Sequence, residues 1–223
     1  MKTENYKIFS GSMLKLLAVI AMFIDHGALI FASFLPEPIY PILRKVGRLA
    51  FPIFCFLVAE GYFHTRNKKK YGLRLLIFAF LSEIPFDWML SDSLFYMGKQ
   101  NIYFTLFFGV LMLYFYENVD DVLKKALLML AVGMVTILLD VDYGIRGVLL
   151  IFLLHVLREQ PVAKTALAFP FLSGGWAAFG AFLPINLYNG RRGFIRSQWL
   201  KYAFYVFYPV HILVLMLIRE FLV

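Results

Sequence analysis

The sequence predicts an all-α fold, a polytopic integral membrane bundle of about eight transmembrane helices. The 223-residue chain is 61% hydrophobic and 16% charged, and its mean hydropathy is +0.75. Soluble domains are typically about 45–50% apolar and 25% charged, so this excess indicates contact with lipid. Apolar runs such as LLAVIAMFI do not alternate with polar residues, so helices are expected rather than the strands of a membrane barrel.

Eight apolar segments give the expected order of helices along the chain. A spanning helix needs about 20 residues, so the fourth and sixth segments are expected to be extended, tilted or incomplete spans. No long linker or internal repeat is visible, which predicts a single domain over 1–223. The segments are Met13–Leu35, Ile42–Phe63, Tyr71–Leu90, Ile102–Tyr116, Val122–Asp140, Ile145–Leu157, Val162–Leu187 and Trp199–Leu222.

The lysines and arginines set the expected orientation. With eight spans, both termini share one side with the Arg66–Arg74 stretch, and this side collects 13 of the 22 cations. The positive-inside rule therefore predicts that both termini are cytoplasmic. Arg191 and Arg192 fall on the opposite side, so either their loop is outside for a functional reason or one short segment does not span. Because the cations lie between apolar runs, no nucleic-acid partner is expected despite the net charge of +8. Membrane lipids are expected partners.

Asp25 and His26 lie near the middle of the first segment, where an ionised group costs about 2.5–3.5 kcal/mol. Adjacent helical residues point about 100° apart, so each is expected to face a different partner inside the bundle. A histidine with a pKa near neutrality suits a general base. The alternative is a buried histidine that joins two helices. We favour function, because carboxylates also occur within other segments.

The second segment carries Arg48 inside its apolar stretch, as well as Glu60 and His64 at i,i+4 spacing. Arg48 is expected to bind an anion, and Glu60 and His64 are expected to form a pair on one helical face. Pro52 is expected to kink this helix or to open its hydrogen-bond ladder. The chain has one cysteine and no HExxH motif, so no metal is expected.

Two further features carry ionisable groups. The basic run RNKKKYGLR is typical of a positive-inside signal that contacts anionic lipid, and it equally suits a site for phosphates, with Arg66 and Arg74 as fork-shaped partners. Glu83 and Asp87 share one face of the third segment and repel each other unless a cation or shared proton joins them; Arg48 or His26 are candidate partners. A salt-bridged packing face is the alternative for this pair.

These segments together resemble the TraX family. The resemblance rests on IDH in the first segment, on GRLAFPIFCFLVAEGYFHTRNKKKYGLRLL running into SEIPFD, and on DYG, LYNGRRG and KYAFYVFYPVHILVL. It covers nearly the whole chain and implies an integral membrane acyltransferase of the prokaryotic plasma membrane that takes an acetyl group from acetyl-CoA. The founding member is associated with N-terminal acetylation of pilin, so the resemblance suggests a pilin-like acceptor or a cell-envelope small molecule or glycan.

The resemblance also distributes roles among the candidate residues. His26 matches the intramembrane histidine that serves acyl transfer in the wider superfamily, and Arg48 would lie near the donor phosphates or the developing oxyanion. A direct transfer and an acyl-histidine intermediate both remain open. The candidate catalytic residues are His26, Asp25, Arg48, Glu60, Glu83 and Asp87, and the candidate donor-binding residues are Arg66, Lys68, Tyr71, Arg74, Asn189, Arg191, Arg192, Tyr208 and His211.

Two other classes of function stay open on the sequence. A proton-coupled permease also keeps acidic residues and histidines within the membrane, although repeated halves with broken helices are expected there and none is visible. A non-catalytic membrane scaffold for pilin-like partners would not need His26. Substitution of His26 therefore separates the scaffold from an acyltransferase.

Overall fold

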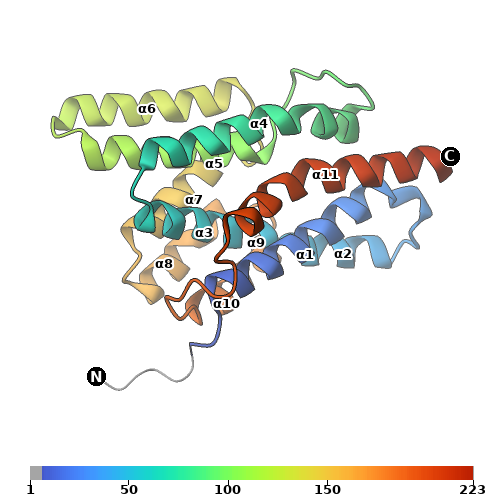
Figure 1. Ribbon diagram of the computed structural model, residues 1–223, viewed down its shortest axis with the longest axis horizontal. Helices are drawn as coiled ribbons and strands as arrows, with labels where there is room; N and C mark the ends of the chain where they lie inside the picture. The colour runs from blue at the N-terminus through green and yellow to red at the C-terminus, as the bar shows by residue number, and fades with distance from the viewer. Residues whose placement is uncertain (1–6, 223) are drawn as a thin grey trace. The chain divides into compact units, whose positions relative to one another are not determined.

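The computed structural model describes residues 7–222, and the regular elements in this range are helical (Figure 1). The chain divides into two compact units. Unit 1 comprises residues up to Leu57 and from Ser173 onward, and unit 2 comprises Val58–Leu172. The α-helices are α1 (Gly11–Ile30), α2 (Ile39–Gly47), α3 (Ala50–His64), α4 (Lys68–Ser91), α5 (Ile102–Asn118), α6 (Val122–Leu138), α7 (Gly144–Val156), α8 (Pro161–Ala168), α9 (Gly175–Phe179), α10 (Phe182–Asn186) and α11 (Gln198–Leu222).

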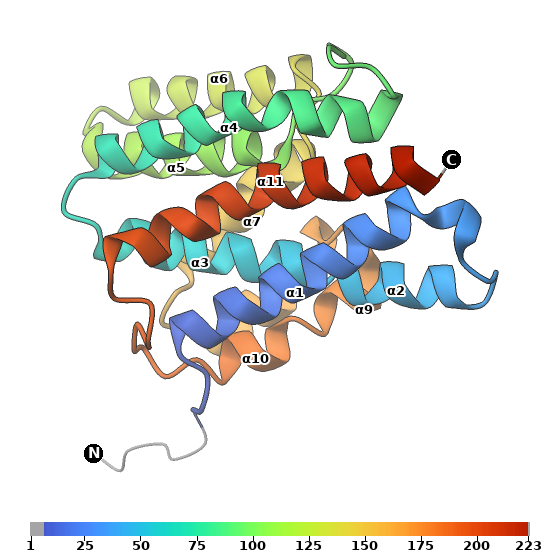
Figure 2. The ribbon, with the colours of Figure 1, turned by 45° about the vertical axis from the view of Figure 1, so that its right-hand side comes forward.

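In unit 1, α1 and α11 lie side by side and run in the same direction (Figures 1 and 2). Near their starts, the Lys15 ammonium lies 5.3 Å from the centre of the Phe204 ring. Further along, the rings of Phe23 and Phe207 are 6.5 Å apart. Contacts therefore advance together along both helices, which is the signature of a parallel pair.

The start of α1 is tied to the loop that precedes α11. The N–H groups of Gly11 and Ser12 donate to the carbonyls of Arg191 and Arg192, at 2.9 Å each. The Ser10 hydroxyl accepts from the N–H of Met13, as expected of an N-cap residue. The first N–H groups of a helix lack partners within the helix, and here the loop supplies them. Residues 191–192 thus lie at the same end of unit 1 as the start of α1.

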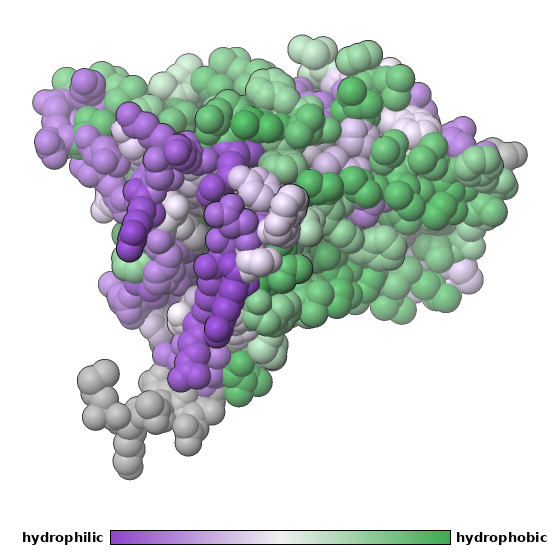
Figure 3. Space-filling model, viewed as in Figure 1, coloured by the Kyte–Doolittle hydropathy of each residue, from purple (hydrophilic) through white to green (hydrophobic). Residues whose placement is uncertain are grey.

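The helices α1 and α11, with 20 and 25 residues, are long and apolar enough to cross a membrane. In Figure 3, hydrophobic residues cover much of the visible side of this pair, while hydrophilic residues gather at the end where α11 begins. Large exposed apolar side chains are typical of a surface that contacts lipid or a partner. On these two helices they include Met13, Leu16, Ile20, Phe23, Val206, Val210, Leu213, Val214, Leu217, Ile218 and Phe221.

The parallel pair does not fit the alternating order of eight spans on which the expected orientation rests. If α1 and α11 both cross a membrane, they cross it in the same direction, so their starts share one side and their ends share the other. Both termini then cannot be cytoplasmic, and Arg191 and Arg192 cannot lie opposite the start of α1. The sequence argument placed Arg191 and Arg192 opposite the start of α1 because it counted every apolar segment as one complete crossing.

Two of the eight expected spans are broken, and the count of eight is not confirmed. The second segment divides into α2 and α3 at Arg48 and Leu49. Pro52 lies in the first turn of α3, where a missing N–H is tolerated, so the break precedes the proline instead of following from it. The seventh segment divides into three short helices and a 3-10 turn, with Gly174 and Gly175 at positive φ between them.

Unit 2 is built around α5. This helix packs against α4, α6 and α7, and α8 packs on α7. Gly109 of α5 lets α7 approach closely, because a methyl group at that position would overlap the side chain of Ile151. Asn101 caps α5 through a 2.9 Å bond from the N–H of Tyr103 to its side-chain oxygen.

Candidate functional site

A polar contact inside unit 1 joins His26 of α1 to His211 of α11. The Nδ1 atom of His26 lies 2.7 Å from the Nε2 atom of His211, and the two rings are nearly parallel, with an interplanar angle of 9°. Tyr208, which is 4% exposed, meets both rings edge-on at 5.8 Å. The structure thus brings three of the sequence candidates together from helices that are far apart in the chain.

The hydrogen bonds define which nitrogen of each ring carries the proton. The Nδ1 atom of His211 lies 2.7 Å from the carbonyl oxygen of Phe207, and a carbonyl can only accept. In a neutral His211, Nδ1 is therefore the donor and Nε2 the acceptor. Nδ1 of His26 must then donate to that Nε2. It follows that neutral His26 carries its lone pair on Nε2.

The environment of His26 leaves this nitrogen available. His211 is buried, with 4% exposure, whereas His26 is only half-buried. Within residues 7–222, no hydrogen-bond partner is found for Nε2 of His26. The pair thus consists of a buried ring that orients its neighbour and a more accessible ring with an open acceptor, which is the arrangement that a general base requires.

Asp25 faces α2 and not the histidine pair. Its Oδ2 lies 2.8 Å from a guanidinium nitrogen of Arg44, and the same guanidinium donates to the Asp25 carbonyl at 3.3 Å. Gly47 packs directly against Asp25, because a Cβ atom at that position would overlap its side chain. The expectation that Asp25 and His26 face different partners is confirmed, and Asp25 serves to hold α2 against α1.

Arg48 lies at the junction of α2 and α3. Its side chain packs against Gly174, where a Cβ atom would come within 2.9 Å of the Arg48 Cγ. No ion pair is found for its guanidinium in the part of the chain that the structure describes. A half-buried arginine without a carboxylate partner remains suited to an anion, as the sequence predicts.

The loop that carries Asn189, Arg191 and Arg192 is organised by its backbone. The N–H of Asn189 donates to the Phe9 carbonyl, and the Asn189 side chain accepts from the N–H of Arg191, both at 2.9 Å. Gly190 has a φ of 73°, which suits glycine. This anchoring leaves the side chains of Arg191 and Arg192 exposed. The donor-binding role expected for these three residues stays a prediction.

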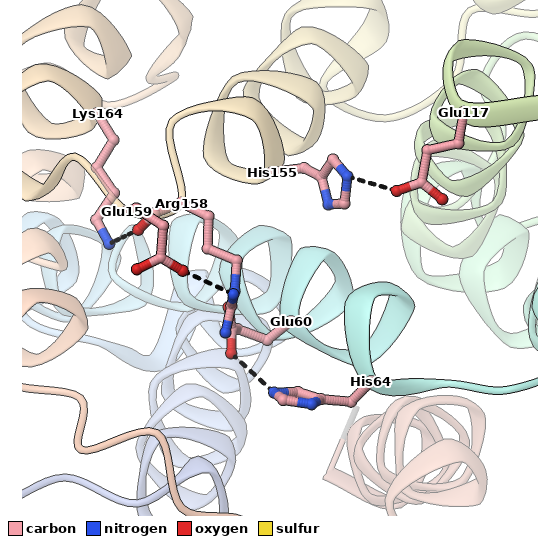
Figure 4. A network of polar contacts seen from close by, with 7 residues as sticks. All are labelled: Glu60, His64, Glu117, His155, Arg158, Glu159 and Lys164. Carbon is pink, nitrogen blue, oxygen red and sulfur yellow. Dashed lines mark hydrogen bonds and ion pairs between the residues drawn. The ribbon is translucent and has the colours of Figure 1, made fainter.

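In unit 2, Glu60 is the centre of a polar network (Figure 4). Its Oε1 accepts from the Nε of Arg158 at 2.6 Å, and its Oε2 lies 3.5 Å from the Nε2 of His64. Arg158 also stacks over the Phe63 ring, at 3.7 Å from the ring centre. The expected pairing of Glu60 with His64 is confirmed, while the stronger partner, Arg158, comes from beyond α7.

A second contact of this network joins α5 to α7. The Nε2 of His155 lies 2.9 Å from Oε1 of Glu117 (Figure 4). The helix α7 itself contains no acidic residue. The structure supplies the carboxylate from another helix. Glu60, Glu117 and His155 lie in the last turns of α3, α5 and α7, which is the placement of a packing network.

Glu83 and Asp87 each bind the loop that joins α4 to α5. Glu83 accepts from the N–H of Asn101 at 3.0 Å and also from its side-chain amide. Asp87 accepts from the N–H of Tyr96 at 2.9 Å. Backbone donors thus bind one oxygen of each carboxylate, while Oδ1 of Asp87 is buried without a hydrogen-bond partner within residues 7–222. A catalytic role for these carboxylates stays a prediction.

Part of the basic run of unit 2 contacts other groups of the protein. The Lys68 ammonium donates to the Tyr62 carbonyl and lies 4.0 Å from the centre of the Tyr62 ring. Burial lowers the pKa of Lys68, while the Glu117 carboxylate opposes that shift. Arg74 lies over the ring of Tyr71, at 5.7 Å, and Arg66 is exposed. Of these four donor-binding candidates, Arg66 is the most accessible to a phosphate.

Sequence reasoning missed Arg44 and Arg158, which pair with Asp25 and Glu60, two of the carboxylates that it did select. Their signal was present, since each lies at the edge of an apolar segment. An arginine at such an edge is equally typical of the positive-inside rule. Across residues 7–222, no three His, Cys, Asp or Glu side chains are grouped in a way that could hold a metal ion.

Comparison with known proteins places the chain in a family. The model of the TraX protein family matches residues 10–219. The probable fimbrial assembly protein FimC, serogroup H1, of Dichelobacter nodosus is 33% identical, over 96% of this chain and 97% of that protein. An uncharacterised protein of Rickettsia prowazekii (strain Madrid E) is 31% identical over 48% of this chain and 37% of its own length. No solved structure matches. The chain therefore belongs to the TraX family.

Proposed function

We propose that this protein is a membrane acetyltransferase that moves an acetyl group from acetyl-CoA to an amine or hydroxyl acceptor, with His26 as the general base. The observation that carries the proposal is the direction of the hydrogen bonds through His211, which leaves the lone pair of His26 on Nε2. In acyl transfer, the attacking group must lose a proton as it adds to the carbonyl carbon. Nε2 of His26 is the atom that would take it.

The proposed step balances as follows. The acceptor nitrogen or oxygen bonds to the thioester carbon, and its proton passes to Nε2 of His26. The tetrahedral oxyanion then collapses, the carbon–sulfur bond breaks, and the proton leaves with the CoA thiol. Arg48 is the candidate cation for the oxyanion, because it lies in unit 1 and its guanidinium carries no ion pair within residues 7–222.

The acceptor is proposed to be a pilin-like protein. Support comes from the relative in Dichelobacter nodosus, whose name describes fimbrial assembly and which aligns with this chain over 97% of its length. A family match indicates the chemistry more firmly than the substrate. We therefore propose the N-terminal amine of such a partner as the first acceptor to examine, with a hydroxyl of an envelope glycan as the second.

The test of the proposed function uses membranes that contain the protein and acetyl-CoA labelled in the acetyl group. We expect a labelled acceptor that is absent from membranes without the protein and from membranes with His26→Gln. Glutamine keeps a hydrogen-bonding group but cannot take a proton near neutral pH. If the same acceptor is labelled equally by the glutamine variant, His26 is not the base, and a scaffold role gains support.

A separate measurement locates the donor phosphates. CoA at a hundred-fold excess over its dissociation constant should stabilise the purified protein by about 2.7 kcal/mol, seen as a rise in melting temperature. The paired variant Arg191→Ala/Arg192→Ala tests unit 1, and Arg66→Ala/Arg74→Ala tests unit 2. The pair whose loss abolishes the rise holds the phosphates. If the parent protein shows no rise, CoA is not the donor.

A further inference from the structure

Phe207 lies flat against the buried histidine of the pair. The centres of the Phe207 and His211 rings are 4.7 Å apart, and the two ring planes differ by 11°. The carbonyl oxygen of the same residue accepts from Nδ1 of His211 at 2.7 Å. Two other rings near His211, those of Phe23 and Tyr208, are inclined to it by 49° and 63°. Phe207 therefore presents both a ring face and a carbonyl to His211.

The histidine pair has no carboxylate that could balance a positive charge. Within residues 7–222, neither His26 nor His211 forms an ion pair. The neighbouring carboxylate, Asp25, pairs with Arg44 at 2.8 Å, and the Arg44 guanidinium is close enough to repel a charge on His26. A proton taken up by the pair thus creates a positive charge among apolar helices, where charge is costly. A group other than a carboxylate must stabilise that charge.

We propose that the ring of Phe207 stabilises the imidazolium that forms on His211 when the pair takes up the proton of the acceptor, an inference that rests on the proposed function. The acceptor's proton passes to Nε2 of His26. The proton on Nδ1 of His26 moves along the 2.7 Å contact to Nε2 of His211. His26 is then neutral, and His211 carries a proton on each nitrogen. Both transfers reverse when the CoA sulfur leaves and takes up the proton.

The physical basis is the attraction between a cation and the face of an aromatic ring. This attraction acts within about 6 Å of the ring centre and is largest where water is excluded. Phe207 and His211 meet both conditions, since their ring centres are 4.7 Å apart and His211 is 4% exposed. The attraction is stronger for an imidazolium than for a neutral imidazole, so it favours the charged state that forms during transfer. Phe207 acts on the reaction through His211 and is a positioning residue.

The electron density of the Phe207 ring can be lowered with little change in its shape. The test replaces Phe207 with phenylalanines that carry one, two or three ring fluorines, which draw electrons from the ring face. We expect the rate of acetyl transfer from labelled acetyl-CoA to fall at each step, to about a tenth of the parent rate with three fluorines. Phe207→Leu, which keeps the carbonyl and loses the ring, should be at least as slow. Equal rates along the fluorinated series overturn the proposal.

Phe204 provides the matched control, about one turn earlier on α11. Its ring also faces a cation, because the Lys15 ammonium lies 5.3 Å from the ring centre. Lys15 takes no part in the proposed proton path, so the same fluorinated residues at position 204 should leave the rate unchanged. If the rate falls equally at both positions, fluorine disturbs α11 as a whole and the proposal is overturned.

A measurement without substrate separates this proposal from the proposed function. The histidines are labelled with nitrogen-15, and His211→Gln identifies the magnetic resonance signals of His211. At an acidic pH where the parent shows both forms of His211, we expect the doubly protonated fraction to fall along the fluorinated series. A constant fraction overturns the proposal. If the fraction falls while the parent protein transfers no acetyl group, the proposed chemistry fails and the stabilisation of charged His211 by Phe207 stands.

Discussion

The histidine pair of unit 1 and the Glu60 network of unit 2 both place polar side chains among apolar helices, but they differ in how those side chains are partnered. Glu60 is 6% exposed, and its Oε1 accepts a hydrogen bond from Arg158. Its Oε2 lies 3.5 Å from His64 and has no hydrogen-bond partner within residues 7–222. His26 and His211 instead share one hydrogen bond, and Nε2 of the more exposed His26 has no hydrogen-bond partner within residues 7–222. A carboxylate that is held by a charged partner supports packing, whereas an oriented nitrogen with an open lone pair is available for chemistry.

The largest effect on stability is expected from removal of the Arg158 side chain. Arg158→Ala leaves the buried Glu60 carboxylate without its main partner and should lower the free energy of unfolding by about 3 kcal/mol. Thermal melting of the detergent-purified variant measures the loss. The double variant Arg158→Ala/Glu60→Gln, which removes the charge as well, should recover part of it. A melting temperature equal to that of the parent would show that Glu60 does not depend on Arg158.

A smaller loss is expected at the contact between α1 and α2. Gly47→Ala places a methyl group against Asp25 and should cost about 1–3 kcal/mol, as overpacking does. Gly27→Ala is the matched control, because nothing lies within 4 Å of its added methyl group, and alanine there should stabilise α1 by up to about 1 kcal/mol. Melting curves that respond alike to the two substitutions would contradict the close packing at Gly47.

The smallest effect is expected at His64. Its side chain is 55% exposed and lies 3.5 Å from Glu60, so the pair is screened by its surroundings. His64→Ala should change the free energy of unfolding by less than about 0.5 kcal/mol. A loss as large as that of Arg158→Ala, measured in the same melting assay, would mean that His64 is an equal partner of Glu60.

Much of the helical pattern follows from the sequence. The expected segments Tyr71–Leu90 and Trp199–Leu222 correspond to α4 and α11 within a few residues at each end. The break at Arg48 and Leu49 was not predicted, because composition alone reports that a stretch is apolar and not that its backbone turns. The direction of α11 relative to α1 could not be predicted from the sequence either, because tertiary contacts determine it.

The site was predictable to a similar degree. His26 stood out because an ionisable residue is costly within an apolar helix. His211 was selected too, but as a contact to the donor, because 185 positions separate the two rings and no local pattern joins them. The role of Asp25 also required the structure, since only the folding back of α2 brings Arg44 to it.

The measurement that tests the central claim most directly is the initial rate of acetyl transfer from labelled acetyl-CoA in matched membranes. The variants compared are His26→Gln, His211→Gln and His211→Leu. Loss of a general base costs about 10²–10⁴-fold, so His26→Gln should fall in that range. His211→Gln, which can still accept from Nδ1 of His26, should keep more activity than His211→Leu. Transfer by His26→Gln at a rate close to that of the parent protein would contradict the account.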